Sequence, residues 1–289
     1  MLPTARADDA EIHAKASQEA RGEEAFKNAL TRLGSEQASE RAAAAEELGR
    51  RGYRFRKQIA DALRPLLSRD PEPAVRAASG RALGRLGIRE AVPELTRALG
   101  DPSADVRAVA AAALWRLPER SSVPALIEHT RDSDAKVREW SALALAATED
   151  ARALAPMIER LTDTDRAVRL AAVRGLGQLN TSESLAPLQR YLTSGSRDEE
   201  EKEEAVRAIA GTDGSERVAV LLALYAAAAS DVAQKKRLLA VLGRVGDAQA
   251  LPLLRKVSSE KDARFRAPAA AAYAAVLARS ASAPDAGAR

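Results

Sequence analysis

An all-α solenoid, a single file of about eight antiparallel helix pairs, is the fold class that this sequence predicts. The first observation is a recurring unit: the dipeptide Val-Arg at 106–107, 137–138 and 168–169 places arginines two steps of 31 residues apart. A period of roughly 20 to 50 residues is typical of repeat architectures, in which each repeat buries its apolar face against a neighbour. The second observation is composition: aromatic residues are only 3%, so the predicted core consists of Leu, Val and Ala.

The repeat extends along the chain when it is aligned on the first cation of each predicted second helix, here termed the register cation. A large apolar residue recurs seven residues after the register cation, and a mostly small one recurs three residues after it. Both offsets lie on one face of a helix, so each second helix is predicted to carry a buried stripe. The register cations are Arg41, Arg76, Arg107, Arg138, Arg169, Lys202, Lys235 and Arg266.

Composition also predicts where the array ends and how its helices are separated. We expect residues 1–22 to form an N-terminal tail or capping helix, 23–279 the repeat solenoid, and 280–289 a disordered C-terminal tail. Glycines predict helix ends with left-handed backbone, and prolines predict the start of the next helix pair. The glycines are Gly84, Gly87, Gly175, Gly177, Gly243 and Gly246, and the prolines are Pro93, Pro124, Pro156, Pro187 and Pro252.

Two stretches carry a resemblance to a known family. The run 101–107, with Asp-Pro at its start and Asp-Val-Arg at its end, and the run 81–93, with its paired glycines and final Ala-Val-Pro, resemble HEAT repeats. They are most similar to the short HEAT-like type found in phycobilin lyases. The resemblance implies a HEAT/armadillo-like right-handed superhelix whose second helices line the concave side. It implies no single activity, because such arrays serve many binding roles.

A row of carboxylates stands six residues before the register cations, at the ends of predicted first helices. Such a row could hold a metal or a substrate, but regular repetition is what stacking requires. We therefore interpret each acid as the partner of an arginine in its own or the adjacent repeat. We expect these pairs to be exposed and to contribute about 0–1 kcal/mol each. The acids are Asp70, Asp101, Asp132, Asp163 and Glu260.

Residues that would support catalysis are scarce. The chain has no cysteine, and its two histidines, His13 and His129, lie far apart in sequence. The His-plus-carboxylate sets of common metal sites are missing. The Gly-Arg-Leu-Gly run at 84–87 follows a predicted helix and lacks the strand and Lys-Ser/Thr signature of a phosphate loop. We therefore expect no catalytic, cofactor-binding or metal-binding residues, and no enzymatic activity.

The candidate binding residues are arginines on the second helices and the two tryptophans. Arginines five residues after a register cation lie opposite the buried face, and those nine residues after it lie on the flank. Both kinds could equally be ordinary solvated surface, and the tryptophans could simply fill gaps between alanines. The candidates are Trp115, Trp140, Arg81, Arg85, Arg116, Arg174 and Arg207.

These features favour a non-enzymatic interaction scaffold that binds a protein or peptide on its concave face. Nucleic-acid binding along the arginine row is the alternative, although Glu46 and several alanines interrupt that row. Phosphate-driven binding would weaken steeply with salt, which separates the two hypotheses. A third possibility, an accessory role in attaching a cofactor to a protein, is implied only by the resemblance to lyases.

Charge and hydropathy give weaker indications of compartment. Lys and Arg number 45 against 41 Asp and Glu, a net charge of +4 that decides nothing about a polyanionic partner by itself. No apolar run approaches the length of a membrane span. As written, the chain is expected in the cytoplasm. Export is the alternative if a leader was removed before Ala7-Asp8, because residues 2–8 look like the end of a secretory signal.

Overall fold

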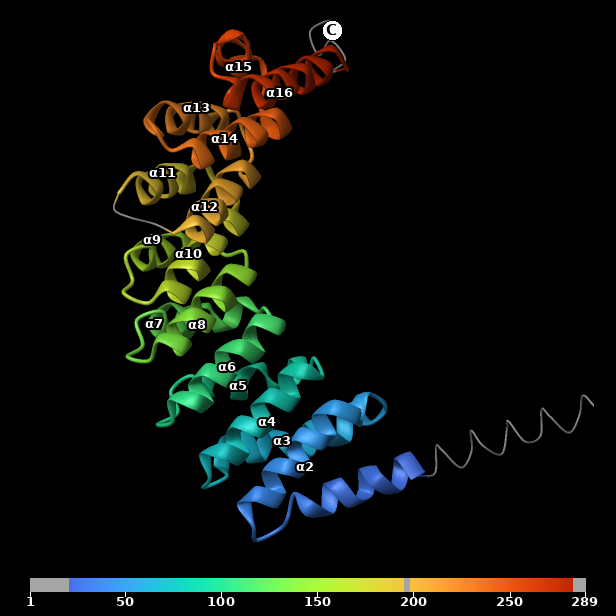
Figure 1. The fold of residues 1–289 in the computed structure, drawn as a ribbon. Helices are drawn as coiled ribbons and strands as arrows, with labels where there is room; N and C mark the ends of the chain where they lie inside the picture. The colour runs from blue at the N-terminus through green and yellow to red at the C-terminus, as the bar shows by residue number, and fades with distance from the viewer. Residues whose placement is uncertain (1–20, 195–197, 283–289) are drawn as a thin grey trace, which may run out of the picture. The chain divides into compact units, whose positions relative to one another are not determined.

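The structure is a computed structural model, and it describes residues 21–194 and 198–282. Within those residues it contains helices and turns and no strand. The chain divides into two compact units, Met1–Ala144 and Leu145–Arg289. In each unit, helices from the first and second positions of the pairs form two layers (Figure 1). The predicted all-α repeat fold is therefore confirmed.

Eight helix pairs follow one another in the described residues. The first helices are 21–32, α3 (Arg56–Arg69), α5 (Val92–Ala98), α7 (Val123–His129), α9 (Leu154–Arg160), α11 (Leu185–Thr193), α13 (Glu216–Ala227) and α15 (Leu251–Ser259). The second helices are α2 (Ala38–Arg51), α4 (Pro73–Arg85), α6 (Ala104–Arg116), α8 (Ala135–Ala147), α10 (Arg166–Leu179), α12 (Glu199–Gly211), α14 (Val232–Val245) and α16 (Ala263–Ser282).

Short 3₁₀ turns lead into most of the first helices. They are η1 (Gly52–Phe55), η2 (Arg89–Ala91), η3 (Arg120–Ser122), η4 (Ala151–Ala153), η5 (Ser182–Ser184) and η6 (Ala248–Ala250). The predicted prolines stand in the first turns of α5, α7, α9, α11 and α15, where a missing amide hydrogen breaks no helical hydrogen bond.

Stacking proceeds through neighbouring second helices within each unit. In the first unit α2 packs on α4 and α4 on α6, and in the second unit α10, α12, α14 and α16 pack in the same order. Of the predicted tails, residues 21–22 and 280–282 are helical, and the remainder, 1–20 and 283–289, lies outside the described residues.

The predicted buried stripe is present on every second helix. The residue three positions after each register cation is fully buried in all eight repeats. The large residue at the seventh position is buried in the first seven repeats, and only Tyr273 in the last repeat is half-buried. Burying a Leu or Ile side chain contributes roughly 1.5–3 kcal/mol, so this stripe is a main source of stability.

Most of the glycines predicted to end helices lie inside them instead. Gly84 is within α4, and a Cβ at this position would lie only 2.6 Å from the Cβ of Ala113 on α6. Glycine is therefore needed because neighbouring second helices approach closely, and not because the helix stops. The same contact recurs between a glycine eight residues after one register cation and an alanine six residues after the next: Gly49 with Ala82, Gly84 with Ala113, Gly177 with Ala208, and Gly243 with Ala272.

Among the predicted glycines, Gly87 has the left-handed backbone expected at a helix end, and at the end of α10 a residue other than glycine adopts it. Gly87 has a φ of 67°, and the following amide of Ile88 donates to the carbonyl oxygen of Leu83, which closes the end of α4. At the end of α10 the corresponding conformation is adopted by Asn180, with a φ of 52°. Asparagine is the residue after glycine that tolerates this region best.

The register cations form a ladder of ion pairs between successive repeats. Arg107 donates from Nε and Nη2 to both carboxylate oxygens of Asp132 in the next repeat, each at 2.8 Å. Its remaining nitrogen, Nη1, donates to the carbonyl oxygen of Asp101 at the end of the preceding first helix. One guanidinium therefore joins two repeats. The same bidentate pairs are Arg41 with Asp70 and Arg76 with Asp101.

The pairing of these acids with arginines of the adjacent repeat is confirmed for Asp70, Asp101 and Asp132, but the expectation that the pairs are exposed is wrong. The side chains of Arg107 and Asp132 are 14% and 7% exposed. Removing one partner of a buried pair leaves an uncompensated charge, which costs about 3–5 kcal/mol rather than less than 1. The ladder thus contributes to stability as well as to register.

The charged segment 198–204 continues the ladder with different residues. Glu201, in the first turn of α12, accepts hydrogen bonds from Arg169 Nε at 2.8 Å and from the Tyr191 hydroxyl at 2.7 Å. The Glu201 side chain is 4% exposed. Asp198 caps this helix in a capping box with Glu201. The ladder then continues through Lys202 to Asp231.

Acid should weaken this ladder. Burial alone raises the pKa of Asp132, but hydrogen bonds from Arg107, from the amide of Asp134 and from His129 outweigh it and lower the pKa to about 2. A carboxyl with a lowered folded-state pKa stabilises the fold above its unfolded pKa of about 4, and this contribution is lost as the pH falls toward 2.

We expect urea midpoints followed by circular dichroism to fall between about pH 4 and pH 2, with Asp132 contributing about 2 kcal/mol. The variant Asp132→Asn should show a smaller loss over the same range. A midpoint that does not change on acidification would contradict this role of the ladder carboxylates.

Candidate partner-binding groove

A groove of about 1000 Å³ lies on the second helices of the first unit. Its lining residues come from α2, α4, α6 and the first half of α8. This is the face that the resemblance predicted for binding. The groove contains four of the seven candidate residues: Arg81, Arg85, Arg116 and Trp140.

The floor of the groove consists of small apolar side chains. Ala77 and Ala78 on α4 and Ala108 and Ala112 on α6 belong to it, together with Val109. Because the floor side chains are short, a partner's side chains could reach close to the helix backbones.

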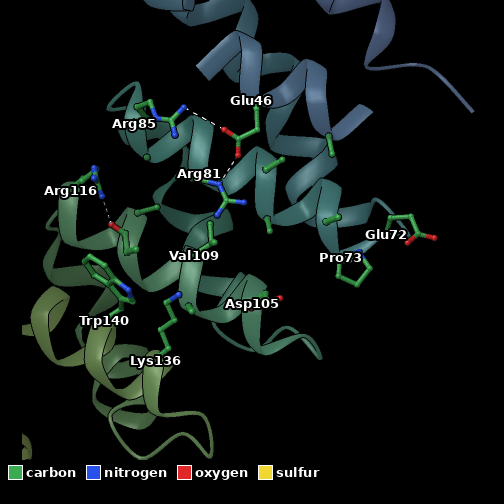
Figure 2. Close-up of a pocket in the computed structure, with 18 of the residues that line it drawn as sticks. Glu46, Glu72, Pro73, Arg81, Arg85, Asp105, Val109, Arg116, Lys136 and Trp140 are labelled. Carbon is green, nitrogen blue, oxygen red and sulfur yellow. Dashed lines mark hydrogen bonds and ion pairs between the residues drawn. The ribbon is translucent and has the colours of Figure 1, made fainter. Parts of the chain in front are cut away.

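An acidic residue neutralises part of one edge of the groove. Glu46 on α2 pairs with Arg81 Nε at 2.6 Å and with Arg85 Nη1 at 3.5 Å. Figure 2 shows both arginines turned toward this carboxylate. Arg81 and Arg85 remain 47% and 41% exposed, so they can still meet a ligand. In the sequence, Glu46 was interpreted only as an acidic residue that interrupts the arginine row. The structure shows that it forms ion pairs with two arginines of that row, Arg81 and Arg85.

The two tryptophans come together at the other end of the groove. Their ring centroids lie 5.7 Å apart with the planes inclined by 54°. Trp140, on α8, lines the groove, and Trp115, at the end of α6, is 40% exposed. The guanidinium of Arg116 lies 5.3 Å from the centroid of the Trp115 ring, within the range of a cation–π contact. The sequence placed the tryptophans in adjacent repeats, and the structure brings their rings together.

The remaining two candidate arginines belong to the second unit. Arg174 pairs with Glu204 at 3.0 Å, and Arg207 pairs with both Glu203 and Glu204 at 2.8 Å. Neither lines the groove of the first unit. The arginine row therefore consists largely of ion pairs with glutamates on neighbouring turns or helices.

Sequence reasoning missed several lining residues. Lys136, Glu72 and Asp105 stand in the first turns of α8, α4 and α6 or just before them, and all three line the groove. A signal was present, because Asp105 and Lys136 each stand two residues before a register cation. Carboxylates at helix N-termini are also expected from the helix dipole, so nothing in the sequence separated a groove position from a capping position.

Neither a metal-binding cluster nor a membrane-spanning helix is present in the residues that the structure describes. There, no three His, Cys, Asp or Glu side chains gather in a group that could hold a metal ion. Among the described helices, none combines the length and apolar character that crossing a bilayer requires.

Sequence comparison agrees with this architecture. The profile of HEAT repeats matches residues 24–115, 92–167 and 154–240. The chain belongs to the HEAT-repeat family. The resemblance seen in its motifs is thereby confirmed. No curated protein sequence matches the chain.

Solved HEAT-like structures resemble this HEAT-repeat chain over most of its length. One chain in the structure of the complex of CpcE and CpcF of phycocyanin lyase from Nostoc sp. PCC7120 is 25% identical with a TM-score of 0.50, and the match covers 87% of this chain and 94% of that one. The Escherichia coli protein YibA is 19% identical with a TM-score of 0.59, covering 90% and 96% of the two chains. The likeness to YibA concerns the fold alone.

Proposed function

We propose that this HEAT-repeat chain is a non-enzymatic scaffold that binds a protein or peptide partner in the groove of its first unit. The observation that carries the proposal is the groove itself, about 1000 Å³ with an alanine floor and the two tryptophans at one end. Interfaces draw much of their affinity from a few buried aromatic and arginine side chains, and this groove offers both types.

The similarity to the CpcE–CpcF complex supports a role in protein assembly. Those two chains form a complex with each other, and this chain is similar to one chain of that structure over 87% of its length. The arginine pairing weighs against the nucleic-acid alternative, because Arg81, Arg85, Arg174 and Arg207 already neutralise glutamates. Phosphate binding would require those pairs to open.

Blocking the groove tests the proposal. Ala112 lies on the floor of the groove, five residues after its register cation, and Ala112→Arg would place a long charged side chain across it. Ala240 occupies the same register position in α14, is exposed, and provides the matched control Ala240→Arg.

We expect Ala112→Arg to weaken binding of partner proteins recovered from cell extract by at least about tenfold, with Ala240→Arg unchanged. Quantitative affinity capture with the three proteins measures this, and circular dichroism checks that each is folded. Equal recovery by Ala112→Arg and the wild type would exclude the groove as the site.

A further inference from the structure

We propose that the tryptophan end of the groove binds an acidic peptide segment in which carboxylates flank a large apolar residue. This inference rests on the proposed function, because it names the chemistry of the partner that the same groove receives. It is carried by three observations: an aromatic residue out of register, an aromatic pair at the end of the groove, and two cations that have no acidic partner among the residues that the structure describes.

Trp115 stands where stacking requires almost no side chain. It lies eight residues after its register cation, and the other seven repeats have Gly or Ala at that position. At Gly84 in the preceding repeat, even a Cβ would lie 2.6 Å from the next second helix. A bulky indole at this position therefore cannot serve the close packing that its sister residues serve. The Trp115 side chain is instead 40% exposed, as expected of a large apolar residue at a binding surface.

Trp140 makes the same departure on the neighbouring helix. It stands two residues after its register cation, where the three preceding repeats have Ala43, Ala78 and Val109 on the groove floor. Its ring is 5.7 Å from that of Trp115, so the two indoles form one aromatic surface. A single apolar side chain of a partner could contact both rings, and a surface of this kind is typical of an interface anchor.

The cations around the aromatic surface differ from the other four candidate arginines in their partners. Arg81 and Arg85 share Glu46, and Arg174 and Arg207 pair with glutamates. Arg116 contacts the Trp115 ring and a backbone carbonyl oxygen, that of Ala112 at 3.4 Å. Neither Arg116 nor Lys136 pairs with a carboxylate from the part of the chain that the structure describes.

These two cations lie on either side of Trp140. Lys136 precedes it by one turn of α8, and Figure 2 shows Arg116 beyond it on the adjacent helix α6. A partner with an apolar side chain on the indoles would thus place its neighbouring residues against positive charge. Carboxylates there would form charge-assisted hydrogen bonds, whereas lysines would be repelled.

Glu72 and Asp105 restrict how much of the bound segment can be acidic, because their carboxylates would repel those of a ligand. Figure 2 shows both on the side of the groove away from Arg116 and Trp140, at the N-terminal ends of α4 and α6. They disfavour a segment that is acidic along its whole length. The expected ligand is therefore acidic only around its apolar anchor, and this also separates it from nucleic acid, whose charge is continuous.

The experiment is a selection of random displayed peptides on the full chain, discarding peptides that also bind Ala112→Arg. We expect the retained peptides to be enriched in Asp and Glu beside a large apolar residue. Selection on the variant Arg116→Glu/Lys136→Glu should enrich Lys and Arg instead. Arg244→Glu is the matched control. Arg244 is exposed, and it lies nine residues after its register cation in α14, as Arg116 does in α6.

A synthetic copy of one retained peptide is then titrated by tryptophan fluorescence. The chain has only two tryptophans, both at this site, so the signal reports on it directly. The double variant should bind at least about tenfold more weakly than the wild type or Arg244→Glu. Trp115→Gly should likewise bind more weakly while remaining folded.

The outcomes separate the two proposals. Retained peptides without acidic enrichment, or unchanged affinity in the double variant, would overturn the acidic ligand and leave the groove as a binding site. If no peptide distinguishes the wild type from Ala112→Arg, both proposals fail. Tighter binding of mixed-sequence single-stranded DNA at the same site, lost steeply with salt, would overturn the peptide in favour of nucleic acid.

Discussion

Replacing Asp132 with alanine is expected to lower the free energy of unfolding by about 3–5 kcal/mol. Asp132 accepts two hydrogen bonds from Arg107 of the preceding repeat, and the two side chains are only 7% and 14% exposed. Without the carboxylate, the guanidinium remains in a poorly solvated position with no countercharge. The measurement is urea unfolding followed by tryptophan fluorescence, because Trp115 and Trp140 lie in the two repeats that this pair joins.

An exposed pair between neighbouring repeats is the control for this loss. Arg89 and Glu119 also form an ion pair, but their side chains are 67% and 41% exposed. Glu119→Ala should therefore cost no more than about 1 kcal/mol. The double variant Arg107→Met/Asp132→Leu should be less destabilised than Asp132→Ala, since it leaves no buried charge. Equal losses for Asp132→Ala and Glu119→Ala would show that burial of the ladder has no energetic consequence.

Two glycine-to-alanine substitutions are expected to change stability in opposite directions. Alanine at Gly84 would place a Cβ 2.6 Å from the Cβ of Ala113 and 2.8 Å from its Cα, so α4 and α6 must move apart. Overpacking of this kind costs about 1–3 kcal/mol. Gly211, the last residue of α12, has no atom within 4 Å of the corresponding position. Alanine there should stabilise the protein by about 0.5–1 kcal/mol, because it restricts the unfolded chain and favours helix.

Chemical denaturation of the two single variants and the wild type tests this pair of predictions. The sign is the decisive result, since helix propensity alone would make both substitutions stabilising. A stabilised Gly84→Ala would mean that α4 and α6 separate at little cost, and that the recurring glycine–alanine contact does not hold the second helices together.

The repeat and its buried face could be predicted from the sequence because they are local properties. A residue three or seven positions after Arg107 lies on one face of its own helix, whatever the rest of the chain does. The same register predicted the carboxylate partners of the ladder, since stacking brings equivalent positions of adjacent repeats together. It did not predict their burial, which depends on how closely the helix ends approach one another.

The candidate site was only partly predictable. Trp115 and Trp140 were identifiable as departures from the repeat pattern, but the contact between their rings depends on how α6 and α8 lie against each other. Glu46 was read as an interruption of the arginine row, and Lys136 was not recognised at all. Which cations are neutralised is decided by distances between neighbouring helices, and a single sequence does not contain those distances.

The sequence by itself determined that this protein is a file of paired helices, which stripe of each second helix is buried, and which positions recur from repeat to repeat. Only the tertiary structure decided that most of the glycines serve close helix contacts, that the ion-pair ladder is buried, and that a groove ends at the tryptophans beside two cations without a carboxylate partner in the described part of the chain. The physical reason is that the periodicity of apolar residues is a property of a single helix, whereas burial and charge neutralisation depend on contacts between helices. Their outcome depends on side chains that lie about 30 residues apart in the chain.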